Sequence, residues 1–487
     1  MCCSEKKTTD GALEAEFDNL IRQCKTSFPR ESHWDMWRSI VRGSLNCVGK
    51  QTITGMLCAQ GLQFNDWSRA YRLFSQSRLD NTQIFKFIRQ QVIEQQDSGD
   101  AIIAHMDDTI IKKSGKHIPG TAWRRDPLGP PFHTNFIWGQ RFLQISLALP
   151  SGKGPCQSRA IPIDFQHCPT PKRPGKKGTI EQIAEFKEQQ KKLKLSKQGK
   201  AAIARLRDQL NLEGQSKRQL IVSVDGSYTN TEVLKGLSDK VTLIGRIRKD
   251  TKLYEQPIIQ PLTGRKRTYG NRLPTPEQIR MSDQFKWQKV QAWAAGKTHD
   301  FKIKVIKNTL WRPAGKEHIL QLIIIKPLGY RLSKGSKILY REPAYLLCSD
   351  NNLDLEKLLQ SYLWRWEIEV NFREQKSLMG CGQAQVRHHQ SCEKVPQFIT
   401  TVYSLLQIAA YKANKNPDSI MLNRAKWYRK KPGQRNTTGD LINNLRAQSW
   451  AKESGITFSS FVSSQLEPRS LKNYPLLNNS PLFYARN

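Results

Sequence analysis

The chain has 487 residues, with 78 lysines and arginines against 42 aspartates and glutamates, which gives a formal net charge of +36. A chain of this length should bury a sizeable core and divide into two or three domains. The charge favours a polyanionic partner, above all nucleic acid. It gives little support to membrane-surface binding, because the basic residues are spread along the whole chain and no basic amphipathic anchor stands out.

The composition also indicates the compartment. Residues 1–20 are acidic and polar where a secretory signal would be apolar, and apolar runs such as Leu322–Ile325 are too short to span a bilayer. Ten cysteines without regular spacing indicate reduced thiols. A zinc site is disfavoured because no paired CxxC accompanies the nearest candidates, which are Cys381, His388, His389 and Cys392. We therefore expect a cytoplasmic protein without a membrane segment.

The first regular pattern along the chain is helical. Between Phe17 and Gln96, apolar residues recur at helical spacing, as in the stripe Trp34, Trp37, Ile40, Val41 and Leu45. This predicts an all-helical domain over residues 1–97. Its basic residues are candidates for contact with DNA ends, although a solvated charged face is the alternative.

Two short apolar runs that follow carry carboxylates. The run from Ala101 contains Asp107 and Asp108, and a later β-branched run ends in Asp225 and Gly226. The segments between them predict two further strands near residues 136–138 and 142–149, then a long helix from Thr179, a capping-box residue, to about residue 212. Each aspartate alone is a weak signal, since Asp followed by Gly more often forms a turn.

The most specific pattern lies near residue 370. Tyr362, Arg365, Glu369 and Lys376 fall at relative positions 0, 3, 7 and 14 of a predicted helix. At about 100° per residue, the four side chains share one face. A carboxylate held among cationic and hydroxyl donors suits a metal-bound phosphodiester site. The alternative is a surface helix whose carboxylates merely pair with neighbouring arginines.

This pattern resembles the tyrosine–arginine–glutamate–lysine signature of bacterial insertion-sequence transposases, which are DDE recombinases with an RNase H-like catalytic domain. The resemblance extends from about Ala101 to Lys376. It implies an α/β RNase H-like core with a β-rich insertion, preceded by the all-helical domain. The order of three strands, a helix and a fourth strand is the one expected of that fold. The implied regions are the first part of the catalytic domain (98–249), the insertion (250–345) and completion of the catalytic domain with the glutamate-bearing helix (346–412). The basic, polar sequence of residues 413–487 predicts a tail that is only partly ordered.

The resemblance also implies a metal site. Asp107, Asp225 and Glu369 would bind two Mg²⁺ ions, for which Mn²⁺ could substitute, because hard oxygen ligands suit these metals. Adjacent strand residues face opposite sides of a sheet, so only one of Asp107 and Asp108 can reach the metals. The family pattern of aspartate, any residue, threonine selects Asp107 together with Thr109, and Asp108 is the alternative.

Phosphate and base contacts are implied in the same way. Tyr362, Arg365 and Lys376 would hold phosphates near the cleaved bond, with arginine suited to bidentate contact. In hairpin-forming relatives, a tryptophan on the preceding strand stacks on a flipped base. Here the direct alignment gives Ala344, and the neighbouring Tyr345 is the aromatic candidate.

The implied function is that of a DNA transposase. It would bind the terminal inverted repeats of its element, cleave there with Mg²⁺ and transfer the strands to target DNA. We expect a homodimer on double-stranded DNA in the bacterial nucleoid, with no membrane partner. The alternatives are a catalytically silent DNA-binding protein derived from a transposase and an RNase H-like nuclease.

Overall fold

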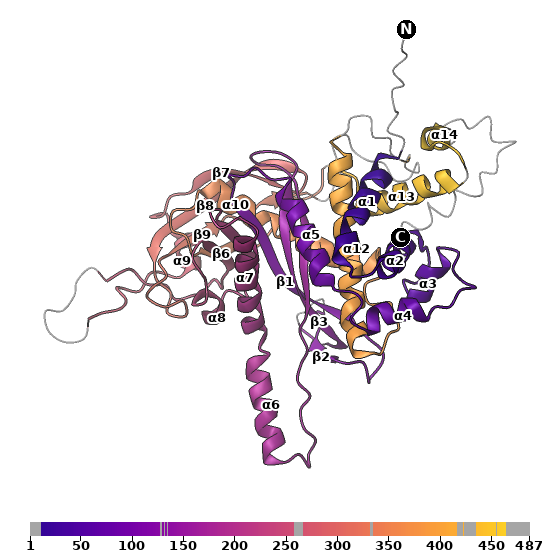
Figure 1. Cartoon of the computed structure of the whole chain (residues 1–487). Helices are drawn as coiled ribbons and strands as arrows, with labels where there is room; N and C mark the ends of the chain where they lie inside the picture. The colour runs from indigo at the N-terminus through magenta and orange to yellow at the C-terminus, as the bar shows by residue number, and fades with distance from the viewer. Residues whose placement is uncertain are drawn as a thin grey trace, which may run out of the picture.

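The computed structural model describes residues 11–126, 129–130, 132–133, 135–257, 266–331, 335–415, 422, 435–453 and 455–463. Within these ranges, the centre of the molecule is a mixed ten-stranded sheet flanked by helices (Figure 1). Nine strands follow the order β2-β3-β1-β5-β6-β12-β9-β8-β7, and β4 pairs with β3. The fold is thus a mixed α/β sheet domain with helices.

The first half of the sheet contains the strands that the apolar runs predict. β1 is antiparallel to β3 and parallel to β5, and β5 is parallel to β6. These strands are β1 (Ile102–Lys112), β2 (Ala122–Arg125), β3 (Phe136–Pro150), β4 (Ser158–His167), β5 (Leu220–Val224) and β6 (Val241–Arg246). The two strands predicted near residues 136–138 and 142–149 are the single strand β3, because the chain stays extended through residues 139–141, and the sequence did not predict β2 or β4. Strands before the helices, and β5 after them, still follow the predicted order.

The region after β6 continues the same sheet. β12 pairs with β6 on one side and β9 on the other, and β8 and β7 follow, all antiparallel. These strands are β7 (Gln288–Ala294), β8 (Lys297–Thr309), β9 (Leu320–Ile325) and β12 (Ala344–Cys348), with a separate hairpin of β10 (Gly329–Tyr330) and β11 (Leu339–Tyr340) and two short helices, α8 (Thr231–Leu234) and α9 (Pro276–Met281). Residues 250–345 are therefore rich in strands, and the main ones extend the central sheet.

The long helix expected after Thr179 is two helices. α6 (Ile180–Lys192) and α7 (Leu195–Leu212) are separated at residues 193–194. The capping box at Thr179 is present, and Gly214 follows α7 with a φ of +79°. α6 has no buried side chain and projects from the body, whereas α7 packs near the sheet (Figure 1). The capping signal was visible in the sequence, but the break at residues 193–194 had no Gly or Pro to reveal it.

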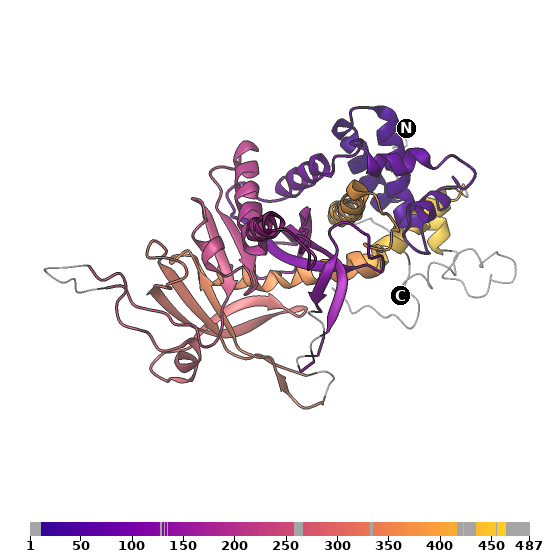
Figure 2. The ribbon, with the colours of Figure 1, turned by 90° about the horizontal axis from the view of Figure 1, so that it is seen from below.

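Helices from both ends of the chain gather beside one end of the sheet (Figure 2). They share one continuous apolar core, so the boundary of a separate N-terminal domain at residue 97 stays a prediction. The members are α1 (Ala12–Gln23), a 3-10 turn (Cys24–Ser27), α2 (Glu31–Asn46), α3 (Ile53–Cys58), α4 (Ser68–Ser75), α5 (Asn81–Ile93), α12 (His389–Ala413) and α13 (Thr438–Glu453), with α14 (Phe458–Ser463) beside α13.

Part of the C-terminal tail forms the helix α13. Arg446 on this helix donates hydrogen bonds to the backbone oxygens of Leu45 and Cys47 at 2.6 and 2.9 Å. The helix buries polar side chains such as Asn443 and Asn444 as well as apolar ones. Its sequence lacks an apolar stripe because hydrogen bonds to α2 replace part of the usual apolar contact, and the pattern therefore did not reveal it.

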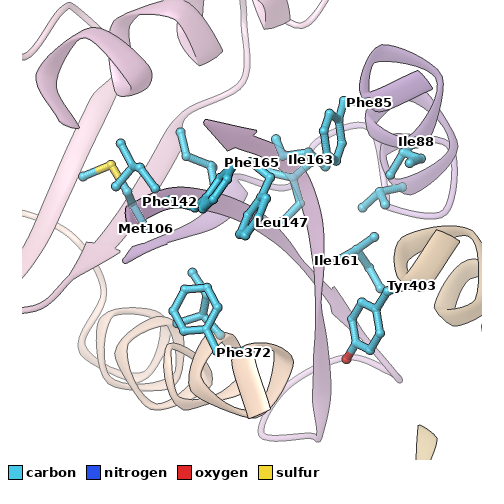
Figure 3. Close-up of a cluster of buried hydrophobic side chains, with 14 of the residues drawn as sticks. Phe85, Ile88, Met106, Phe142, Leu147, Ile161, Ile163, Phe165, Phe372 and Tyr403 are labelled. Carbon is cyan, nitrogen blue, oxygen red and sulfur yellow. The ribbon is translucent and has the colours of Figure 1, made fainter. Parts of the chain in front are cut away.

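The main apolar core includes side chains from both faces of the sheet, since α7 and α11 (Trp366–Ser377), which lie on opposite faces, both contribute to it (Figure 3 shows part of it). Phe142 on β3 stacks on Phe165 of β4 with ring centroids 4.7 Å apart. Side chains from α5, α11 and α12 close over them, including Phe85, Phe372 and Tyr403. This packing fixes α11, the helix that carries Glu369, against β1 and β4.

Among the described helices, none is long and apolar enough to cross a membrane.

Candidate active site

The sheet places the first two predicted aspartates side by side. Met106 on β1 pairs with Val224 on the parallel strand β5, so Asp107 and Asp225 are the next residues of adjacent strands. β5 ends at this point while β1 continues. Two carboxylates that lie 118 residues apart in the sequence are thereby brought to one edge of the sheet.

Arg365 connects the first aspartate to the predicted glutamate. Its Nη1 lies 3.1 Å from Oδ2 of Asp107, and its Nη2 lies 3.0 Å from Oε1 of Glu369. The Arg365 side chain is 14% exposed, and that of Glu369 is 38% exposed. A buried guanidinium thus holds one carboxylate on β1 and another on α11 within reach of each other, with the Glu369 end open to solvent.

The sequence predicted one helix for the signature segment, but the structure has two. α10 (Leu355–Trp364) and α11 meet at Arg365, where the backbone keeps helical angles but makes shorter-range hydrogen bonds. The amide of Arg365 donates to the oxygen of Tyr362, and the amide of Ile368 donates to the oxygen of Arg365. Across this junction the Arg365 guanidinium still reaches Asp107 on β1.

The other two signature residues lie on the same side. Nζ of Lys376 donates to Oγ1 of Thr109 at 2.6 Å, and Thr109 shares a face of β1 with Asp107 because the two are two residues apart. The Tyr362 ring lies 6.0 Å from the Arg365 guanidinium. Burial lowers the pKa of Lys376. The structure therefore brings Tyr362, Arg365 and Lys376 to the face of β1 that carries Asp107.

The electrostatics of Asp107 are unusual for a carboxylate. Burial, together with the negative charge of Asp225, raises its pKa to about 7, against the opposing effect of Arg365. The ionised form is disfavoured because the group is desolvated and faces a like charge. A bound cation would relieve both costs.

Asp108 points to the opposite face of β1, where it contacts two side chains. Tyr228 donates its hydroxyl to Oδ1 of Asp108 at 2.8 Å, and Nε of Arg141 lies 3.2 Å from Oδ2. These contacts lie on the α7 side, where Tyr228 also packs against Gly199. Of the two aspartates, Asp107 is the one that lies with Arg365 and Glu369.

Tyr345 does not join this group. Its side chain is buried on β12, and its hydroxyl donates to Glu277. It lines a pocket together with Gly226, the residue after Asp225, but little of its ring is exposed for stacking. The exposed aromatic of the signature segment is instead Trp366, which is largely solvent-exposed.

The described side chains around Asp107 offer oxygen donors for a metal, but they do not form a closed site. Within the described ranges, no three His, Cys, Asp or Glu side chains lie close enough together to form a metal site as they stand. Cys381 and Cys392 are buried free thiols, and burial raises the pKa of Cys381 to about 12. The oxygen donors of Asp107, Asp225 and Glu369 fit Mg²⁺ chemically, and the raised pKa of Asp107 marks a place where positive charge is favoured.

Two functional contacts had little or no sequence signal. Tyr228 follows Asp225 by three residues and contacts Asp108, but no motif marks it. A glycine inside a helix, such as Gly199 in α7, is only a weak signal in a sequence. In the structure, a Cβ at this position would lie 2.8 Å from the Tyr228 ring. Both show that the turn after β5 is held tightly to β1.

A family model described as DDE superfamily endonuclease matches residues 25–301, which is more than half of the chain. The protein therefore belongs to the DDE superfamily endonucleases. This membership implies a nuclease or transposase activity on DNA, and members of the superfamily use divalent metals. The match contains Asp107 and Asp225 and ends before Glu369. No curated protein has a matching sequence.

Proposed function

We propose that this protein is a DNA transposase of the subgroup with the tyrosine–arginine–glutamate–lysine signature, built on an RNase H-like core. It binds the terminal inverted repeats of its element, cleaves there and transfers the strands to target DNA. The observation that carries the proposal is the bridge of Arg365 between Asp107 and Glu369, beside Asp225. Family membership indicates DNA as the substrate. The bridge brings in the third carboxylate, Glu369, which lies beyond the residues that the family model matches.

Asp107, Asp225 and Glu369 are the residues that would hold divalent metal. Two bound Mg²⁺ ions, or Mn²⁺ in their place, supply an activated water on one side of a phosphodiester and stabilise the leaving oxygen on the other. The protein contributes placement. Asp107 and Asp225 are fixed by strand register, and Glu369 is fixed by a helix packed on the same sheet.

The cations of the signature then act on the substrate. Arg365 presents a planar guanidinium, which contacts phosphate oxygens in pairs, and Lys376 presents a compact positive charge anchored on Thr109. Burial of both side chains limits screening by solvent, so their attraction to a phosphate is stronger than that of surface cations. Tyr362, whose ring lies 6.0 Å from the Arg365 guanidinium, would add a hydroxyl contact to phosphate.

The protein works as a homodimer in the bacterial nucleoid, because paired transposon ends require two active sites on DNA. A hairpin intermediate receives no support from Tyr345, whose ring is buried. Trp366 is the more accessible aromatic next to Arg365.

The test is to incubate the purified full chain and Mg²⁺ with duplex DNA that carries the element's own ends, and to map the cuts at nucleotide resolution. We expect cuts at the ends and joined products. Asp225→Asn and Glu369→Gln should remove cleavage and leave DNA binding intact, because the basic surface is unchanged.

Two other outcomes would replace the proposal. Cleavage of DNA that lacks the ends, without joining, would indicate an RNase H-like nuclease. Binding of the ends without any cleavage in Mg²⁺ or Mn²⁺ would indicate a catalytically silent, transposase-derived DNA-binding protein.

A further inference from the structure

The ribbon formed by β2 and the first part of β3 presents aromatic side chains to solvent. Trp123 is 67% exposed and Phe136 is 61% exposed. Trp123 pairs across the ribbon with Trp138, and Arg125 pairs with Phe136. Three aromatic rings and a guanidinium therefore lie together on one face, because directly opposed residues of an antiparallel pair point the same way. We call this set the ribbon patch.

Strand register places the ribbon patch on the catalytic face of the sheet. Asp107 opposes Gln144, and Ile111 opposes Gln140. Along β3, Gln144, Gln140 and Trp138 lie on one face because they are separated by even numbers of residues. Gln144 accepts a hydrogen bond from Gln375 of α11, which confirms that this is the face that α11 covers. The patch is thus on the side of Asp107.

The opposite face of the ribbon gives an independent check. Arg124, between Trp123 and Arg125, is buried and donates to Thr170. Burial and the charge of Arg141 lower its pKa to about 10, against the opposing effect of Asp108. Asp108 is the residue on the far side of β1 from Asp107. Arg124 therefore points away from the catalytic face, and its two neighbours on β2 point toward it.

The ribbon is continuous with the proposed phosphate-binding residues. β2 is the outermost strand of the sheet next to β3, at the end where β1 runs on past Asp107 (Figure 1). Nζ of Lys112, at the end of β1, lies 3.7 Å from Oδ2 of Asp126, just after β2. Lys376 contacts Thr109, three residues before Lys112 on β1, so the base of the ribbon lies near the signature lysine.

The ring geometry favours stacking partners. Trp123 and Trp138 meet edge to face with centroids 5.5 Å apart, so they do not cover each other's faces. Solvent-exposed rings beside cations are the arrangement by which proteins bind unpaired nucleotides, since every base has a face that can stack. An apolar protein partner would suit Trp123 and Phe136 equally, but Arg125 and a chain with a net charge of +36 favour a polyanion.

We infer that the ribbon patch binds unpaired bases of DNA next to the cleavage site. This inference rests on the proposed function for the position of that site, but the binding itself requires no cleavage. The patch would hold strands that have opened near the cut, by stacking on Trp123 and Phe136 and by contact of Arg125 with the backbone. It would thereby favour distorted over fully paired DNA.

The experiment compares two probes of mixed sequence, a 40-base-pair duplex and the same duplex with a central run of six unpaired nucleotides. Affinities of the full chain are measured by fluorescence anisotropy in EDTA, so that no cleavage occurs. We expect Trp123→Ala and Phe136→Ala to weaken binding to the unpaired probe about 5-fold to 150-fold, the range for loss of one stacked base, and to change binding to the duplex much less.

Matched variants separate stacking from other effects. Tyr340→Ala removes an equally exposed ring, 69% exposed, from the β10–β11 hairpin and should leave both affinities unchanged. Trp123→Phe should restore most of the affinity, because phenylalanine also stacks. It should also reduce the quenching of tryptophan fluorescence by the unpaired probe. Thermal unfolding of each variant checks that the fold is retained.

Equal affinities of wild type and Trp123→Ala for the unpaired probe would overturn the inference. So would unchanged DNA affinity with a loss of dimer in mass photometry, which would make the patch an interface between two copies. Failure here leaves the transposase proposal standing if the wild type still cuts and joins element ends. Conversely, if the wild type prefers the unpaired probe but does not cleave element ends, the inference about the ribbon patch stands and the transposase proposal fails.

Discussion

Tyr228 donates a hydrogen bond to Asp108 across 2.8 Å, and this bond ties the turn after β5 to β1. Tyr228 is fully buried and follows Asp225 by three residues, while Asp108 follows Asp107 directly. The amide of Asp108 also donates to Oδ1 of Asp107 at 2.8 Å. The Tyr228–Asp108 hydrogen bond, on the far face of the sheet, thereby fixes the separation of Asp107 and Asp225 on the catalytic side.

Removal of the Tyr228 hydroxyl should therefore affect catalysis more than binding. We expect Tyr228→Phe to lower the strand-cleavage rate about tenfold or more, because small displacements of reacting groups are costly, and to reduce the free energy of unfolding by about 1–3 kcal/mol. DNA affinity should not change, and raised Mg²⁺ should restore part of the rate. Tyr411→Phe, which loses a hydroxyl contact to the Pro150 oxygen, is the control. Equal rates for the two variants would show that the Tyr228 contact is only structural.

The two adjacent aspartates should differ sharply. Asp107→Asn should abolish cleavage, since it alters the carboxylate beside Asp225 and Arg365. Asp108→Asn should retain measurable cleavage but unfold at a lower temperature, because it weakens the contacts with Tyr228 and Arg141. The measurement is cleavage of end-bearing DNA together with thermal unfolding. The reverse ranking of activities would move the first ligand to Asp108.

The pKa of Asp107 predicts a pH dependence of stability without metal. Because its pKa in the folded protein, about 7, is above its unfolded value, Asp107 favours folding below about pH 4. That contribution is lost as the pH rises from about 4 through 7. We expect the difference in melting temperature between wild type and Asp107→Asn to shift across this window in metal-free buffer, in favour of the variant at higher pH. A constant difference would contradict the raised pKa.

Metal should act on the same group with the opposite pH trend. Protons compete with Mg²⁺ for the carboxylate, so the rise in melting temperature that Mg²⁺ produces should be larger at pH 8 than at pH 6. In Asp107→Asn the rise should be small at both pH values. Addition of EDTA should reverse it in the wild type. A rise that does not depend on pH or on Asp107 would place the bound metal elsewhere.

The sequence predicted the parts of the site better than their connections. The runs that carry Asp107 and Asp225 become adjacent strands, since β-branched residues with flanking polar ones specify strands locally. The same kind of reasoning missed the break between helices at Arg365 and the helix α13, because neither is marked by Gly, Pro or an apolar stripe. Tyr228 could not be predicted as a partner of Asp108, since contacts between residues 120 apart arise only from the fold.

Arg365 gives the most discriminating prediction, because it is buried between two carboxylates and does not act as a surface ion pair. An exposed pair is worth at most about 1 kcal/mol, whereas loss of one partner from a buried pair can cost about 3–5 kcal/mol. Protonation of Asp107 and the partial exposure of Glu369 offset part of that cost here. We therefore expect Arg365→Ala to lower the melting temperature clearly in metal-free buffer.

Mg²⁺ should then stabilise Arg365→Ala more than it stabilises the wild type, since the ion replaces the missing positive charge between Asp107 and Glu369. The cleavage rate should still fall about a hundredfold, because a preorganised donor to the substrate phosphate is lost and the metal does not replace it. Arg205→Ala removes an arginine that pairs with Asp164 on β4 and should show neither effect. Lys376→Ala, which leaves the Asp107 and Glu369 pair intact, should lose rate without the enlarged response to Mg²⁺. If Arg365→Ala responds to Mg²⁺ as the wild type does and cleaves at a similar rate, the arginine only stabilises the junction of α10 and α11.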